Sequence, residues 1–227
     1  MRNLALAAVA GLALTGAAQA DIYNDEIFDT FTGAGGGILD IVSVEVTNDL
    51  TNINFTIELL GDVEATNWGK YMVGIHTGPG GDTAGNGWNR PISMPIGMNI
   101  WLGGWVDGSN GLENRQFNGS AWNLAAATYG PNAGTLSASK SGNLVTYSVS
   151  LASLGLSFGQ TIQFDVFSSG GGGGDGAIDS LSNPNQSVGD WGTPYSAQLL
   201  NSYTVVPTPG VAALGLVGLA AAGRRRR

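Results

Sequence analysis

The chain of 227 residues carries 17 acidic residues, nine basic residues and one histidine, and it has no cysteine. The lack of cysteine excludes disulfides, thiol catalysis and thiolate metal sites, and a single histidine excludes a zinc site built from several histidines. All the acids but only four basic residues lie between residues 21 and 205, which gives this middle part a net charge of −13. So acidic a surface repels nucleic acid, and we expect no nucleic-acid partner.

The first 20 residues have the layout of a secretory signal peptide. One positive charge at Arg2 precedes an uncharged, mostly apolar stretch from Leu4 to Leu14. Ala18 and Ala20 then form the small-x-small pattern at which signal peptidase cleaves. The pattern predicts an N-terminal signal helix and, after cleavage, a mature chain that starts at Asp21.

Period-two alternation of apolar and polar residues dominates the middle of the chain and is typical of half-buried strands. The predicted strands are Val42–Val46, Ile53–Leu59, Tyr71–Ile75, Asn99–Val106, Gln116–Ala126, Leu144–Leu151 and Thr161–Phe167. The range Gln116–Ala126 covers one or two short strands. Turn residues at Asn48–Asn52 predict a hairpin between the first two strands. One helical turn is expected near Leu151–Leu154.

Glycine- and asparagine-rich loops separate these strands, and the longest are Gly78–Asn89 and Ser168–Gly192. Many short strands with turn signals between them are typical of an antiparallel sandwich or barrel. The sequence therefore predicts an all-β fold, a single antiparallel β-sandwich of jelly-roll or Ig-like layout over residues 21–205.

The C-terminal residues 206–227 form a three-part tail. The segment Pro207-Thr208-Pro209-Gly210 is followed by an uncharged stretch from Val211 to Gly223 and then by the arginines Arg224, Arg225, Arg226 and Arg227. The apolar stretch is shorter than the roughly 20 residues that a permanent span needs. Positive charge that flanks such a segment stays on the cytoplasmic side, which places the domain outside, in agreement with the signal peptide.

This tail resembles the PEP-CTERM protein-sorting signal, with Thr208 where the motif usually has glutamate. The resemblance implies a hydrophobic C-terminal helix with transient inner-membrane association and processing by an exosortase-type sorting enzyme. It also implies export across the inner membrane and delivery to the cell surface or the extracellular polysaccharide matrix. A simple tail anchor is the alternative.

A second resemblance covers the middle domain, from about Ile22 to Val205. The opening hairpin, the segment Trp68–Ile75 that runs into a Gly/Pro/Asp loop, and Gly176–Leu181 carry it. In these features the domain is similar to the sandwich modules related to family 9 carbohydrate-binding modules and to DOMON-like domains. The resemblance implies a β-sandwich.

Trp101 and Trp105 are the main candidates for ligand binding. Side chains alternate between faces along Asn99–Val106, so its aliphatic residues would face the core and the two tryptophans would share the opposite face. About 13 Å apart, they would stack on separate sugar rings, and Trp88 and Trp191 from the long loops would extend this carbohydrate platform. The alternative is a strand buried on both faces, with the tryptophans in the core.

Gly170–Gly176 matches one unit of the glycine/aspartate nonapeptide, which binds calcium when many units stack. Asp175 and Asp179, together with carbonyl oxygens of this loop, are therefore candidate ligands of a calcium ion. The alternative is a solvated turn. No other cofactor is expected.

These features predict an exported, non-catalytic β-sandwich protein that binds polysaccharide. One alternative is a structural matrix or coat protein without a small ligand. Another is a secreted glycoside hydrolase, which needs two carboxylates about 5–10 Å apart that the sequence alone does not pair. No catalytic residue is predicted.

Overall fold

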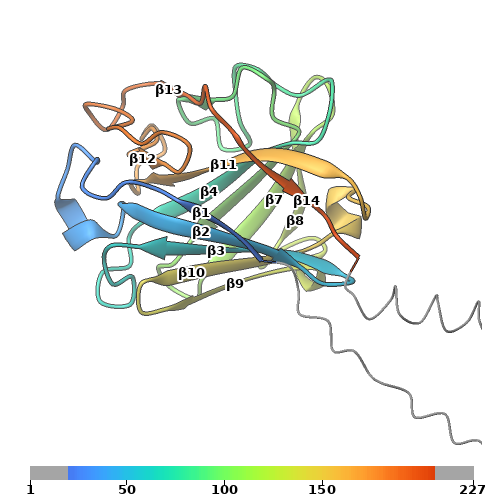
Figure 1. The fold of residues 1–227 in the computed structure, drawn as a ribbon, viewed down its shortest axis with the longest axis horizontal. Helices are drawn as coiled ribbons and strands as arrows, with labels where there is room; N and C mark the ends of the chain where they lie inside the picture. The colour runs from blue at the N-terminus through green and yellow to red at the C-terminus, as the bar shows by residue number, and fades with distance from the viewer. Residues whose placement is uncertain (1–19, 208–227) are drawn as a thin grey trace, which may run out of the picture.

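The structure is a computed structural model that describes residues 20–207, and its regular elements are almost all strands (Figure 1). The predicted signal helix and the predicted C-terminal helix lie outside these residues. Within residues 20–207, no helix is long and apolar enough to span a membrane. The helical elements there are short 3₁₀ turns: η1 (Ala34–Gly37), η2 (Ala133–Thr135) and η3 (Ala152–Leu154). The last of these confirms the helical turn expected near Leu151–Leu154.

Two large antiparallel sheets make up the described part of the molecule. The first has the order β1 (Ala20–Asn24), β2 (Ile41–Asn48), β3 (Asn52–Leu59), β10 (Leu144–Ser150) and β9 (Leu136–Ser141). The second has the order β12 (Asp179–Ser180), β11 (Thr161–Ser169), β4 (Lys70–His76), β6 (Ile100–Trp105), β7 (Gly111–Phe117) and β8 (Trp122–Ala127), and β14 (Asn201–Thr204) also pairs with β11. A short parallel ribbon joins β5 (Ile92–Ser93) to β13 (Tyr195–Ser196). The prediction of an all-β, antiparallel fold is confirmed.

The strands of the five-stranded sheet form because alternate apolar side chains need one buried face. In β3, alternate residues are fully buried, namely Ile53, Phe55, Ile57 and Leu59. The predicted hairpin between β2 and β3 is present. Its turn is held by the Asp49 carboxylate, which accepts the N–H groups of Thr51 and Asn52 at 2.6 and 2.7 Å.

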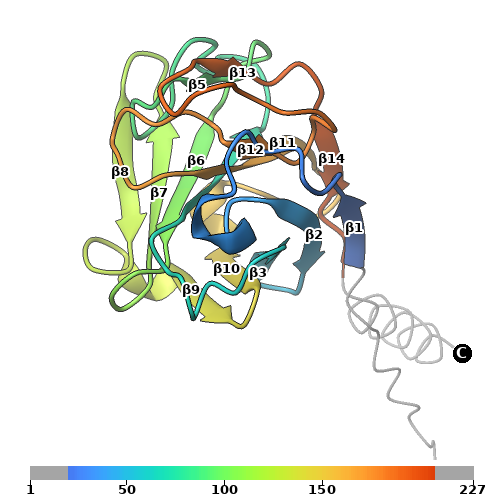
Figure 2. The same cartoon turned by 90° about the vertical axis from the view of Figure 1, so that its left-hand side faces the viewer.

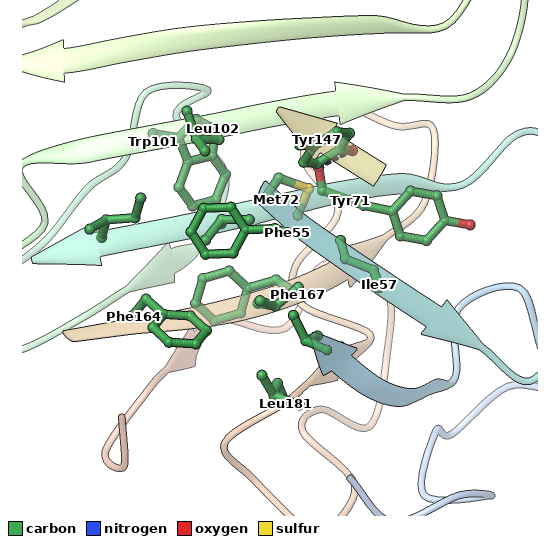
Figure 3. Packing of buried hydrophobic residues seen from close by; sticks show 14 of the residues in the cluster. Phe55, Ile57, Tyr71, Met72, Trp101, Leu102, Tyr147, Phe164, Phe167 and Leu181 are labelled. Atoms are coloured by element: carbon green, nitrogen blue, oxygen red, sulfur yellow. Dashed lines mark hydrogen bonds between the residues drawn. The ribbon is translucent and has the colours of Figure 1, made fainter. Parts of the chain in front are cut away.

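The two large sheets pack face to face, in a β-sandwich-like arrangement. The ring of Phe55 in β3 meets that of Phe164 in β11 at a centroid distance of 5.7 Å. The Tyr147 hydroxyl in β10 donates to the Tyr71 carbonyl in β4 at 3.1 Å, so the buried hydroxyl has a partner. Figure 3 shows these four side chains within one cluster of buried residues.

The segment between β1 and β2, which contains η1, lies across one end of the two layers (Figure 2). The two ends of the described chain, at Ala20 and Pro207, lie on the far side of the molecule from η1 (Figure 1). Ala20 pairs with Thr47 in β2. The amide of the next residue, Asn48, accepts the N–H of Val206 at 3.0 Å and donates to its carbonyl at 2.9 Å. Both ends are therefore held at neighbouring positions of β2.

Candidate functional site

The outer face of the seven-stranded sheet, which points away from the five-stranded sheet, is covered by loops. Gly74 in β4 lies on this face, and a Cβ atom there would come within 2.7 and 2.8 Å of the sulfur atoms of Met98 and Met94. Trp101 lies opposite Gly74 in the next strand. The ring of Phe167 stacks on that of Trp101 at 6.1 Å. The segment between β4 and β6 thus forms a second apolar layer over the sheet.

The prediction that Trp101 belongs to an exposed platform is wrong, because its side chain is fully buried. Leu102, which points to the other face of β6, is fully buried as well. The strand is therefore buried on both faces. The physical reason is that the segment between β4 and β6 packs onto the outer face: Met94 and Met98 lie over Gly74, the strand partner of Trp101, and Gly87 lies against the Trp101 ring itself.

Trp88 and Trp105 do come together, with ring centroids 6.4 Å apart. Each ring lies over a glycine of the sheet, Trp88 over Gly103 and Trp105 over Gly111, where a Cβ atom would overlap the ring. Trp105 remains partly exposed and lies 5.8 Å from the ring of Tyr129, which is 63% exposed. Two of the four tryptophans predicted to form the platform, Trp88 and Trp105, therefore lie together at the edge of the covering loop.

Glu113 in β7 connects these rings through its buried carboxylate. It accepts hydrogen bonds from Trp88 Nε1 at 2.8 Å, from Arg115 Nε at 2.7 Å and from the Tyr129 hydroxyl. Burial raises the pKa of Glu113, but the hydrogen bonds from Arg115, Tyr129 and Trp88 outweigh it and hold the pKa below its ordinary value. We name Trp88, Trp105, Glu113, Arg115 and Tyr129 the aromatic–Glu113 cluster.

Trp191 is not part of this cluster. Its ring contacts Phe31 at 5.6 Å and Trp68 at 6.2 Å. Phe31 lies in the segment between β1 and β2, and Trp68 lies in the segment between β3 and β4. Of the four tryptophans predicted as one platform, Trp88 thus contacts both the buried Trp101 and the partly exposed Trp105, each at 6.4 Å, whereas Trp191 lies in a separate group.

Asp175 and Asp179, the two predicted calcium ligands, have different surroundings. Asp175 closes its own loop, because its Oδ2 accepts the N–H of Gly172 at 2.8 Å. Asp179 is fully buried in β12, where its two oxygens accept the N–H groups of Ile41 at 2.6 Å and Ser180 at 2.8 Å. The two carboxylates therefore accept hydrogen bonds from different parts of the chain: Asp175 from its own loop, and Asp179 from β2 and β12.

Asp179 instead joins two carboxylates that the sequence did not single out. Asp29, Asp40 and Asp179 each offer one oxygen, and these oxygens lie within 4.8 Å of one another. We name these residues the three-aspartate group. Asp29 and Asp40 come from the segment between β1 and β2, and Asp40 directly precedes β2. No local motif links them to Asp179.

The residues predicted to direct processing lie at or beyond the ends of the described chain. Ala20 is the first residue of β1, and Pro207 is the last residue that the structure describes. The others lie outside residues 20–207, namely Ala18, Pro209, Gly210, Arg224, Arg225, Arg226 and Arg227. No known protein family matches this chain, and no curated protein matches its sequence.

Proposed function

We propose that this chain is an exported, non-catalytic β-sandwich protein that is sorted through its C-terminal tail to the cell surface or the extracellular matrix. The position of the two chain ends supports this proposal. Ala20 and Val206 are held side by side at Thr47 and Asn48, so signal peptide and tail would leave the domain at one place. The other end of the sandwich would then point away from the membrane.

The junction with the tail supports the same proposal. Val206 is fixed on both its N–H and its carbonyl by the buried Asn48 amide, and Tyr203 in β14 donates to the same Asn48 at 2.7 Å. The segment Pro207–Gly210 follows directly. The segment Pro207–Gly210, which a sorting enzyme would cleave, would thus follow directly after Val206, whose backbone is held by hydrogen bonds.

We also infer that the scaffold has an Ig-like layout rather than a jelly-roll layout. The strands β2, β3, β10 and β9 lie opposite β14, β11, β4 and β6. These orders correspond to the A-B-E-D and G-F-C-C′ orders of Ig-type sandwiches. Such a fold hosts many functions, so it supports a display role without selecting a ligand.

Mass spectrometry of the protein from its native host tests the proposal. The expected mature species starts at Asp21 and lacks Arg224–Arg227. Replacement of the four arginines should release unprocessed protein from the membrane, because guanidinium groups resist entry into hydrocarbon and hold the tail during processing. Mature surface protein that keeps Arg224–Arg227 contradicts sorting and leaves a simple tail anchor.

Polysaccharide binding is the second candidate function, and the partly exposed edge of the aromatic–Glu113 cluster favours it. Trp105 is partly exposed and Tyr129 is 63% exposed, and aromatic rings bind the C–H-rich faces of sugars. Arg115 uses only its Nε in a hydrogen bond within residues 20–207, so its two terminal nitrogens are available to sugar hydroxyl groups.

Glycan-array and polysaccharide-retention experiments test this second candidate. Trp105→Ala should abolish retention, whereas Phe158→Ala, which removes a 42% exposed ring elsewhere, should leave it unchanged. Folded wild-type protein that no polysaccharide retains would favour the structural matrix role.

A further inference from the structure

We propose that the three-aspartate group binds a calcium ion, which would join the segment between β1 and β2 to β12 of the seven-stranded sheet. The carboxylate oxygens of Asp29, Asp40 and Asp179 already lie within 4.8 Å of one another. Two of these residues precede β2 and the third lies at the edge of the other sheet. A cation here would therefore tie together parts of the chain that are far apart in sequence.

Several buried carboxylate oxygens of this group have no hydrogen-bond partner among the described residues, which indicates that the group can bind a ligand. Asp40 is only 3% exposed, and its Oδ2 accepts the N–H of Phe28 at 2.9 Å. Its Oδ1 and both oxygens of Asp29 are buried and have no hydrogen-bond partner among the described residues. Because a buried ionised carboxylate is strongly unfavourable without a partner, these three oxygens require a proton or a cation.

The charge around the group gives the same indication. Neither of the two ion pairs within residues 20–207 includes one of these carboxylates. The Oδ2 of Asp25, in the same segment between β1 and β2, is also buried and has no hydrogen-bond partner among the described residues. A divalent cation would balance this concentration of negative charge.

The donor set selects calcium among the common cations. All the candidate ligands are carboxylate oxygens, which suit hard cations such as calcium and magnesium. Calcium accepts six to eight oxygens in irregular arrangements, whereas magnesium requires a small octahedron and retains several waters. Three aspartates from two segments of the chain, with Asp25 beside them, fit the larger and more adaptable ion.

The site is tested first on the purified full chain, stripped of divalent cations with EDTA. Isothermal titration with calcium chloride should give one binding event per chain. Calcium at about a hundred times its dissociation constant should raise the melting temperature by about 5–10 °C, since a ligand that binds the folded state stabilises it. No heat of binding and an unchanged melting temperature would overturn the proposal. An equal rise with magnesium chloride would overturn the assignment to calcium.

Two variants then locate the site. Asp29→Asn removes a charge without breaking a hydrogen bond, because neither Asp29 oxygen has a partner in the described chain. It should melt at the same or a higher temperature than the wild type in EDTA and should lose the calcium-dependent rise. Asp175→Asn is the matched control from the glycine-rich loop and should retain the full rise. A complete calcium response in Asp29→Asn, or its loss in Asp175→Asn, would contradict this location.

Discussion

The aromatic–Glu113 cluster and the three-aspartate group both contain buried carboxylates, yet their surroundings are opposite. Both Glu113 oxygens accept hydrogen bonds from side chains, and its pKa lies below the ordinary value. Within residues 20–207, neither oxygen of Asp29 has a hydrogen-bond partner, and burial raises its pKa to about 6. The comparison shows that hydrogen-bond donors, rather than burial alone, decide whether the pKa of a buried carboxylate lies below or above its ordinary value. A carboxylate with donors is part of the internal hydrogen-bond network, whereas one without donors is a candidate metal ligand.

The largest expected effect comes from removing the carboxylate that is fully bonded. Glu113→Ala leaves Trp88 Nε1 and Arg115 Nε without their acceptor, and we expect the free energy of unfolding to fall by about 2–4 kcal/mol. Urea denaturation measures this loss. Glu64→Ala, at an exposed position, is the control and should stay within about 0.5 kcal/mol of wild type. A loss below about 1 kcal/mol for Glu113→Ala would show that the network is not structural.

Beside the three-aspartate group, by contrast, a substitution is expected to increase the free energy of unfolding. In EDTA at neutral pH, Asp25→Asn should stabilise the protein by about 1–2 kcal/mol, because the raised pKa makes Asp25 take up a proton on folding and an amide avoids that cost. Its Oδ2 has no hydrogen-bond partner among the described residues, so no bond is lost there. Thermal unfolding in the absence of divalent cations measures the gain. Asp190→Asn, at an exposed position, should leave the melting temperature unchanged. Destabilisation by Asp25→Asn would mean that the ionised carboxylate has a partner in the folded protein.

A smaller effect should follow from removing one donor of Glu113. Tyr129→Phe keeps the ring beside Trp105 but deletes the hydroxyl that donates to Glu113. We expect a loss of about 0.5–1.5 kcal/mol by urea denaturation. In the Glu113→Gln background the same substitution should cost less, since its charged acceptor is gone. Equal losses in both backgrounds would place the hydroxyl outside the network.

The smallest effect is a pH dependence. The folded-state pKa of Glu113 lies below its ordinary value of 4.5. Its ionisation therefore contributes stability that is present above the unfolded pKa and is lost as the pH falls through the folded pKa. The difference in unfolding free energy between wild type and Glu113→Gln should therefore shrink between pH 6 and pH 3. A difference that grows toward pH 3 contradicts the direction of the pKa shift.

Much of the fold follows from local patterns. The alternation in β3 and β10 is visible in the sequence because one face of each strand is buried and the other is not. The strands β9 and β14 were not predicted, since they are short or polar and lie at sheet edges. In β9 only Leu136 is buried, and the remaining residues are small or charged.

The candidate sites were harder to predict, because they depend on contacts that no local pattern records. Alternation places Trp101 and Trp105 on one face of β6, but it does not say which of them a loop covers. The segment between β4 and β6 buries Trp101 and leaves Trp105 partly exposed. Similarly, Asp29 and Asp40 come close to Asp179 only because β12 packs beside the start of β2. There the N–H of Ile41 donates a hydrogen bond to Asp179, which lies 138 residues further along the chain.

The neighbouring positions of the two chain ends have a consequence for engineering. Because Ala20 and Val206 are fixed at adjacent residues of β2, a short linker would close residues 20–206 into a ring. A closed chain can be reopened at an exposed turn such as 118–121 to give a circular permutant, or inserted as a unit into a surface loop of another protein. The β-sandwich-like domain could thus be attached to another protein at a different point of its chain without a change to its core.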